Sequence, residues 1–309
     1  MTSPGIVAQA PSDGGSLDDL SRGEPARVRQ TRSAGPGVRV LGVALSILGA
    51  LLLGFVLDVG PLGDLRHARD RQVDYAALRG ALANGVAPVG GAVRPGTPVA
   101  VLDVPALHLR EVVREGTTAK DLARGPGHRR DTPLPGQAGV SVVMGRQTTF
   151  GGPFLHLREL RPGLQFTMTT GQGRHTFRVI GLRRAGDPQP PAPAAGHGRL
   201  TLVTADGTPF MPRGILRVDA DLVSQVQAAG APGVTPGALP EDETPMGVQR
   251  SAWLPLVLWG QALLAAAAAV AWTHARWGRR PTWVVGVPLL GALGLTVADQ
   301  AAQLLPNLM

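Results

Sequence analysis

Three runs of apolar residues constrain this chain most, because each is about as long as a membrane-spanning helix. They lie at 38–58, 251–273 and 283–303. A helix needs roughly 20 apolar residues to cross a bilayer, so the sequence predicts three transmembrane helices. For the first run the alternative is a cleaved signal peptide, although the leader before it is long and no clear small-residue cleavage site follows. For the last two runs the alternative is a helical hairpin buried in a soluble domain.

Arginine marks one side of these runs. Several arginines precede the first run, and others fill the short turn at 274–282 between the last two. Because positively charged segments favour the cytoplasmic side, we predict a multi-pass plasma-membrane protein whose N-terminus and basic turn are cytoplasmic and whose residues 99–223 are extracellular. Tryptophans stand near the ends of the last two runs, as in an aromatic belt: Trp253, Trp272, Trp277 and Trp283.

Composition excludes several kinds of chemistry. The chain has no cysteine, which rules out disulfides, zinc–cysteine sites and a cysteine nucleophile. Its net charge is +8, and Lys120 is the only lysine. The arginines are scattered and no basic–aromatic stripe accompanies them, so we expect no nucleic-acid partner. The histidines lack metal-ligand spacing, and we expect neither a metal nor a cofactor.

The remaining segments differ sharply in composition. Residues 1–37 are rich in Gly, Ser, Pro and charge, which predicts a disordered cytoplasmic segment. Residues 59–98 are expected to form a helical stalk from Asp64 to Asn84 and then a linker, and 224–250 reads as a second linker. Residues 99–223 form the one stretch typical of a compact soluble domain. Many short strands separated by turn signals predict a mainly β fold, a closed β-barrel with short helices. The expected strands are Val99–Val104, Leu107–Arg114, Val140–Met144, Gln165–Thr170, His175–Gly181, Leu200–Ala205 and Ile215–Leu222; the expected helices are Thr118–Arg124 and Pro153–Leu160.

Two of these strands carry the most informative motif. The stretches are Val140-Ser141-Val142-Val143-Met144-Gly145-Arg146-Gln147 and Arg199-Leu200-Thr201-Leu202-Val203-Thr204-Ala205-Asp206. Together they resemble the sortase family, the cysteine transpeptidases of Gram-positive cell walls. In that family one strand ends in Gly-His-Arg and the other in Thr-Leu-Val-Thr-Cys. Here Arg146 stands at the histidine position and Ala205 at the cysteine position.

The resemblance covers about 99–223 and is nearest to the class E type of actinobacteria. Two departures accompany the lost catalytic pair: Val140 replaces the usual Asn, and Leu164 replaces the usual acidic residue. The supporting motifs are Val104-Pro105-Ala106-Leu107, Arg124-Gly125-Pro126-Gly127-His128, Thr132-Pro133-Leu134-Pro135-Gly136 and Thr148-Thr149-Phe150-Gly151-Gly152-Pro153-Phe154, followed by Leu157, Leu160 and Gly163.

The resemblance implies a reaction that these residues do not support. In the family a thiolate attacks a peptide carbonyl, a histidine protonates the leaving amine and an arginine holds the oxyanion. Ala205 has no nucleophilic atom, and Arg146 is permanently charged. Either Arg213 or Arg217 stands where the family keeps its arginine.

Other candidates near the lost pair are less suited to catalysis. Strand alternation is expected to point Thr204 and Asp206 away from the face that carries Ala205. His128 belongs to the upstream motif, and we expect its ring to be satisfied by backbone groups. Thr148 is the remaining residue that we expect near the cleft, together with Thr204, Asp206 and His128.

Arg146 admits two interpretations. It is either a groove arginine paired with a carboxylate such as Asp206 or Asp219, or part of an anion site with Arg213 or Arg217. The proline-rich segment 187–193 is either a substrate-facing loop or a plain connector.

The function expected from the sequence is therefore a membrane-anchored, inactive sortase-like protein that binds a peptide or a cell-envelope partner. The alternatives are an active transpeptidase or hydrolase that uses no cysteine, and a structural membrane protein.

Overall fold

The computed structural model describes residues 36–230, 233–277 and 279–309. The segment expected to be disordered therefore lies outside the described residues, apart from positions 36 and 37. The chain divides into two units, 1–46 and 47–309. Of the first unit, only the beginning of one helix is described.

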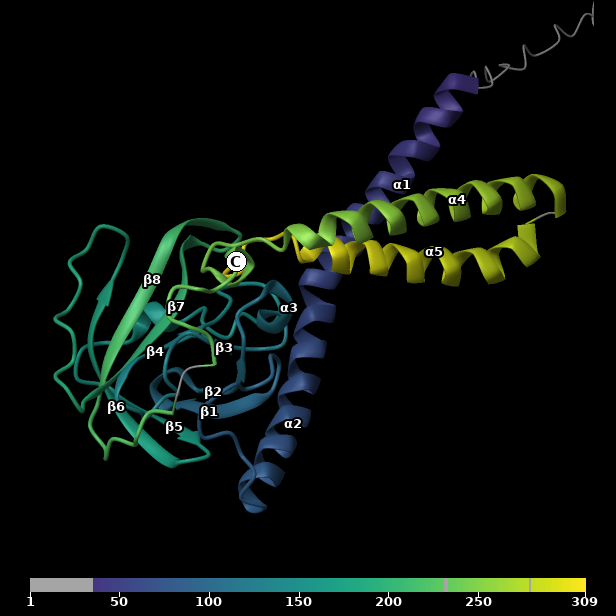
Figure 1. Ribbon diagram of the computed structural model, residues 1–309. Coiled ribbons are helices and arrows are strands. Elements are labelled where there is room, and N and C mark those ends of the chain that lie inside the picture. The colour runs from purple at the N-terminus through teal and green to yellow at the C-terminus, as the bar shows by residue number, and fades with distance from the viewer. Residues whose placement is uncertain (1–35, 231–232, 278) are drawn as a thin grey trace, which may run out of the picture. The chain divides into compact units, whose positions relative to one another are not determined.

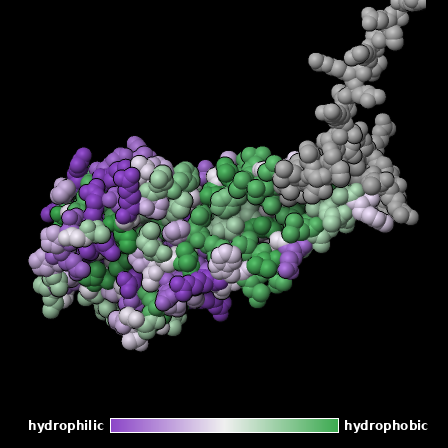
Figure 2. Space-filling model, turned by 90° about the horizontal axis from the view of Figure 1, so that it is seen from above, coloured by the Kyte–Doolittle hydropathy of each residue, from purple (hydrophilic) through white to green (hydrophobic). Residues whose placement is uncertain are grey.

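Three helices carry the apolar runs. They are α1 (Pro36–Val59), α4 (Trp253–Trp277) and α5 (Arg279–Ala302). Stretches within Leu48–Ala83, Arg250–Thr273 and Val284–Ala302 are long and apolar enough to cross a membrane. Large apolar side chains on these helices are exposed, among them Leu52, Leu254, Leu264, Val284 and Val285. Figure 2 shows apolar residues gathered on the helical part of the molecule and hydrophilic residues gathered on the barrel. A surface of this kind fits hydrocarbon better than water.

Helix α2 (Pro61–Ala83) follows α1 after Gly60. Proline at its first position suits a helix start because the missing N–H would be unpaired there anyway. It ends at Asn84, followed by Gly85 with a positive φ of 66°. The expected helical stalk is confirmed as a helix. Its Leu78 packs in a cluster with barrel residues Val101 and Val112, so it is braced against the domain.

Eight strands close into a barrel in the order β1-β2-β3-β4-β7-β8-β6-β5 (Figure 1). The expected closed β-barrel is confirmed. The strands β4 and β7 run parallel, whereas β7 and β8 form a long antiparallel hairpin. The strand bounds are β1 Pro98–Val104, β2 Leu109–Glu115, β3 Gly127–His128, β4 Gly139–Met144, β5 Gln165–Thr170, β6 Gly173–Arg183, β7 Gly198–Thr208 and β8 Met211–Leu222.

Side chains that alternate along these strands fill the barrel. Phe166 and Phe177 stack at 5.7 Å between ring centroids, and they belong to an apolar cluster contributed by most of the strands. Its fully buried members include Val99, Leu102, Val113, Val143, Met168, Leu200, Leu202 and Val218. The period of two that predicted the strands is the same period that places these residues inside.

The local differences from expectation have local causes. β2 begins at Leu109, because Pro105–Leu107 form the short helix η2 and His108 adopts a φ of 50°. The predicted helices shrink to α3 (Ala119–Leu122) and η3 (Leu157–Glu159). β3 is too short to show a period. There, a Cβ on Gly127 would lie 2.1 Å from the carbonyl oxygen of Gly116, so the strand needs glycine at that position.

The described residues of the segment expected to be a linker, 224–230 and 233–250, lie against the barrel. The segment contains η4 (Glu241–Glu243) and leads into η5 (Arg250–Ala252). Glu243 is buried and pairs with Arg130, while Thr117 donates a hydrogen bond to its carbonyl oxygen at 2.8 Å. The expected turn 274–282 is largely helical, because α4 extends to Trp277 and α5 begins at Arg279.

Candidate functional site

The site lies where β4 ends beside the middle of β7. Their parallel register pairs Met144 with Val203. Gly145 extends the pairing, since its N–H donates to the carbonyl of Val203 at 3.0 Å and its own carbonyl accepts the hydroxyl of Thr204 at 2.9 Å. Arg146 therefore follows the end of β4 beside the neighbouring strand that carries Ala205. The expected strand Leu200–Ala205 is longer in the structure, so Ala205 lies within β7 and not at its end.

Ala205 presents only a methyl group. It is 1% exposed and belongs to an apolar cluster with Leu122, Met144, Val203 and Leu308. A methyl group carries neither a nucleophilic electron pair nor a proton to transfer. This part of β7 therefore supplies packing and no reactive atom.

Arg146 lies beneath the surface rather than at the cleft mouth. It is 1% exposed, and its guanidinium lies 4.9 Å from the ring centroid of Phe150. Its Nη1 donates to the hydroxyl of Thr149 at 3.0 Å and its Nη2 to the carbonyl of Ala119 at 3.1 Å, whereas its Nε has no partner. Burial lowers the pKa of Arg146 to about 10. The side chain therefore stays charged at neutral pH and cannot act as a proton shuttle there.

Of the acceptors considered for Arg146, the structure shows a backbone carbonyl, that of Ala119, and neither Asp206 nor Asp219. Asp206 pairs with Arg184, and Asp219 pairs with Arg183 and accepts a hydrogen bond from Thr201. The cause is the chain after β4, which folds back over the arginine. Phe150, Gly151 and Gly152 have φ values of 53°, 82° and 47°, and the N–H of Phe154 donates to the carbonyl of Arg146 at 3.1 Å.

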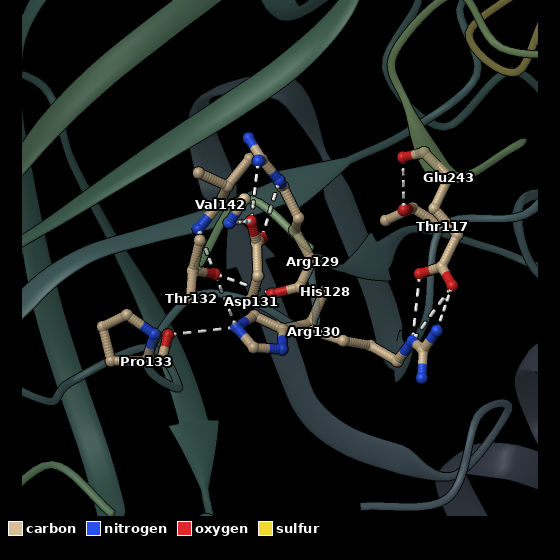
Figure 3. A network of polar contacts seen from close by, with 10 residues as sticks. Thr117, His128, Arg129, Arg130, Asp131, Thr132, Pro133, Val142 and Glu243 are labelled. Carbon is tan, nitrogen blue, oxygen red and sulfur yellow. Dashed lines mark hydrogen bonds and ion pairs between the residues drawn. The ribbon is translucent and has the colours of Figure 1, made fainter. Parts of the chain in front are cut away.

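His128 belongs to a polar network on another face (Figure 3). It pairs across β3 and β4 with Val143 of the barrel core, so it faces the interior and not the side of Met144 and Ala205. Its Nδ1 lies 2.8 Å from a carboxylate oxygen of Glu115, and its Nε2 lies 3.0 Å from the carbonyl of Pro133. The hydroxyl of Thr132 lies 3.2 Å from the same Nε2. The ring is satisfied by a carboxylate as well as by the backbone.

The network around His128 joins distant segments. The hydroxyl of Thr132 donates to the carbonyl of Arg129 at 2.8 Å and accepts the N–H of Val142 at 3.2 Å. Arg129 pairs with Asp131, and Arg130 pairs with Glu243 (Figure 3). These contacts fix the loop between β3 and β4 and attach η4 to it. They have a structural role, and none of them aims a reactive group at Ala205.

A cavity of about 270 Å³ opens beside the strand ends. Arg217 on β8, opposite Val203, lines it. Burial, and secondly the charge of Arg183, lower the pKa of Arg217, while Asp219 acts in the opposite direction. The guanidinium of Arg217 forms no hydrogen bond or ion pair with another described residue. The other lining residues come from β4, β7 and the segment after β6: Arg129, Val140, Val142, Met144, Arg183, Arg184, Ala185, Gly186, Asp187, Gln189, Thr201 and Val203, with Pro245.

The remaining candidates are placed less centrally. Arg213 is exposed and does not line this cavity. The hydroxyl of Thr148 is buried without a partner. The proline-rich segment contributes Asp187 and Gln189 to the cavity wall, which favours a ligand-facing loop over a plain connector. Within the residues that the structure describes, no group of three or more His, Asp or Glu side chains is arranged to hold a metal ion.

One part of the site has no signal in the sequence. Leu308, after α5, is fully buried against Ala205 and its neighbours. The sequence separation exceeds one hundred residues, and no periodic pattern continues past the last apolar run. Only the three-dimensional contacts reveal this approach.

Comparison with known proteins agrees with the resemblance. Residues 102–214 match the family model described as Sortase domain. A stretch of 80 residues is 30% identical to Sortase D of Bacillus subtilis (strain 168) and covers 26% of this chain. The match spans only 39% of that relative's length.

Solved structures of similar fold include two studied with peptides. Sortase E1 from Streptomyces coelicolor, with a tripeptide in the active site, is 21% identical over 43% of this chain and 93% of that chain, with a TM-score of 0.38. Sortase C of Clostridium perfringens, with the C-terminal cell wall sorting motif, is 16% identical over 50% and 89% of the two chains, with a TM-score of 0.39.

Proposed function

From the sortase-like domain at 102–214 we infer a membrane-anchored protein that binds a peptide or cell-envelope partner without cleaving it. The observation that carries this proposal is the methyl group of Ala205, buried on β7 at the position where the resemblance calls for a thiol. Arg146 beside it is buried and charged, so neither the nucleophile nor the acid of a transpeptidase is available.

The nearby polar side chains are engaged elsewhere, which argues against a substitute mechanism. Thr204 donates its hydroxyl proton to the carbonyl of Gly145. Asp206 pairs with Arg184, and His128 is held between Glu115 and Pro133. General base catalysis needs a base within hydrogen-bond reach of its nucleophile. Thr204 and Asp206 form no such pair. The Nε2 of His128 does lie 3.2 Å from the hydroxyl of Thr132, but that hydroxyl donates to the carbonyl of Arg129, and the pair lies on the face of Val143 and not at Ala205. The geometry at Ala205 therefore does not support the alternative of a cysteine-free active enzyme.

The cavity beside β4, β7 and β8 favours a binding role over a purely structural one. Its partly buried Arg217 has lost hydration and has no acceptor within the described residues. An arginine in that state gains most from a carboxylate, which accepts charge-assisted hydrogen bonds. We therefore propose a peptide with an acidic side chain as the partner.

Peptide binding tests this role directly. The full chain in lipid nanodiscs is titrated with short acidic peptides and with the same peptides in which Asp and Glu become Asn and Gln. We expect the acidic set to bind, and Arg217→Gln to weaken that binding at least about tenfold, because a hydrogen bond to a charged group contributes about 1.5–3 kcal/mol. Arg213→Gln, on the same strand but outside the cavity, is the matched control. Equal binding by both peptide sets, or equal losses in both variants, would reject the acidic partner.

The orientation in the membrane is also a proposal. We infer a cytoplasmic N-terminus, a cytoplasmic 274–282 segment and an extracellular barrel, since arginine gathers on the first two. Protease added to intact protoplasts should digest the barrel and spare a tag placed at residue 1. Digestion of that tag while the barrel survives would show that the chain has the opposite orientation in the membrane.

A further inference from the structure

The segment that follows α5 lies in the site at Ala205. Leu308 is fully buried in the cluster formed by Leu122, Met144, Val203 and Ala205. We propose that this degenerate site is a socket for the chain's own segment 306–309, which closes it and fastens the last apolar helix to the barrel. The inference rests on the proposed loss of catalysis, because a segment held there meets no nucleophile.

Backbone contacts hold the segment as they would hold a bound peptide. The N–H of Gln147 donates to the carbonyl of Leu308 at 2.9 Å. The hydroxyl of Thr149 donates to the carbonyl of Met309 at 2.6 Å. Both donors belong to the turn that directly follows the end of β4. The segment itself is a turn, since the N–H of Met309 donates to the carbonyl of Pro306 at 3.0 Å, and the two bonds from the β4 side fix this turn in place.

Arg146 has a role in this arrangement. Its Nη1 donates to the hydroxyl oxygen of Thr149, which leaves that hydroxyl's single proton for Met309. The guanidinium thus orients the donor that holds the segment. This accounts for a buried charge that has no carboxylate partner among the described residues.

The other wall of the socket comes from the 224–250 segment. Asn307 is fully buried, and its side-chain amide donates to the carbonyls of Asp242 and Thr244 at 2.6 and 2.8 Å. Its N–H donates to the carbonyl of Gly247 at 3.0 Å. Leu308 therefore enters an apolar pocket while Asn307 is fixed by three backbone acceptors, an arrangement specific to this order of residues.

The chain's lack of cysteine makes the contact directly measurable. In the full-length double variant Ala205→Cys/Leu308→Cys, the two introduced thiols are the only ones present. Mild oxidation in nanodiscs should link them within one chain, as read by mass spectrometry of the proteolysed product. Val223→Cys/Leu308→Cys is the control, because Val223 is exposed beyond the opposite end of β8, and it should not link. Links no more frequent than in this control, or links only between two chains, would overturn the proposal.

Accessibility provides a second readout that does not need a linked pair. In Ala205→Cys alone, the thiol should react slowly with a water-soluble maleimide because Leu308 covers it. Adding Leu308→Asp should speed that reaction at least tenfold, whereas adding Val223→Asp should leave it unchanged. Equally slow labelling in both backgrounds would show that Leu308 does not cover the site.

The outcomes separate this inference from the proposed function. A closed socket together with peptide cleavage by the wild-type chain would reject only the loss of catalysis. An open socket together with no cleavage would reject only the occupancy by segment 306–309.

Discussion

The substitution Arg114→Met is expected to lower the free energy of unfolding by about 3–5 kcal/mol, the usual cost of leaving one buried charge without its partner. Arg114 on β2 and Asp74 on α2 are 2% and 5% exposed. The Nε of Arg114 donates to a carboxylate oxygen of Asp74 at 2.6 Å, and its Nη1 donates to the carbonyl of Gly96 at 3.2 Å. Methionine keeps most of the volume but leaves the Asp74 carboxylate in a dry contact between helix and barrel.

A matched pair on the same helix provides the control. Arg124 pairs with Asp70, but their side chains are 43% and 27% exposed. Arg124→Met should therefore cost less than about 1 kcal/mol. The double variant Asp74→Leu/Arg114→Met should recover much of the loss, because it removes both buried charges.

Unfolding of the barrel must be followed without tryptophan, since all five tryptophans lie at or after Trp253. Far-ultraviolet circular dichroism of the full chain in detergent during denaturant titration provides the signal. Losses of equal size in Arg114→Met and Arg124→Met would mean that the buried pair does not brace α2 against the barrel.

Much of the barrel follows from local pattern. β4 and β7 alternate apolar and polar residues over enough positions to show their period, and both were predicted within one or a few residues of their observed bounds. β3 escaped prediction, because two residues cannot show a period and Gly127 is explained only by its approach to Gly116 from another strand. The three apolar helices were predictable because a helix that crosses a bilayer needs roughly 20 apolar residues, and runs of that length can be read directly from the sequence.

The site was only partly predictable. The resemblance placed Arg146 and Ala205 side by side, and the parallel register of β4 and β7 agrees. It could not reveal that Gly151 and Gly152 turn the chain back over Arg146 and bury it, since the turn depends on positive φ values that local sequence merely allows.

Contacts between distant segments were the least visible in the sequence. Leu308 reaches Ala205 and Glu243 reaches Arg130 across more than one hundred residues. No periodicity or motif connects such positions, and with one sequence there is no covariation to pair them. The strands that carry the site were therefore predictable from the sequence, and the distant residues that pack against them were not.

The second large effect concerns activity, where we expect complete absence. A transpeptidase needs a nucleophile that forms a covalent intermediate, and β7 offers only the methyl group of Ala205 at that position. Restoring the family pair with Ala205→Cys/Arg146→His should not restore turnover by itself. Val140 and Leu164 also depart from the family, and Leu308 covers the restored position.

The most direct test is mass spectrometry of the full-length wild-type chain in nanodiscs, incubated with a pool of sorting-signal peptides and an amine acceptor. A protein-free reaction sets the blank, and the same pool incubated with an active sortase shows that the peptides can react. The account predicts no cleaved or ligated peptide above the blank from the wild-type chain. A product that rises with protein concentration would contradict it.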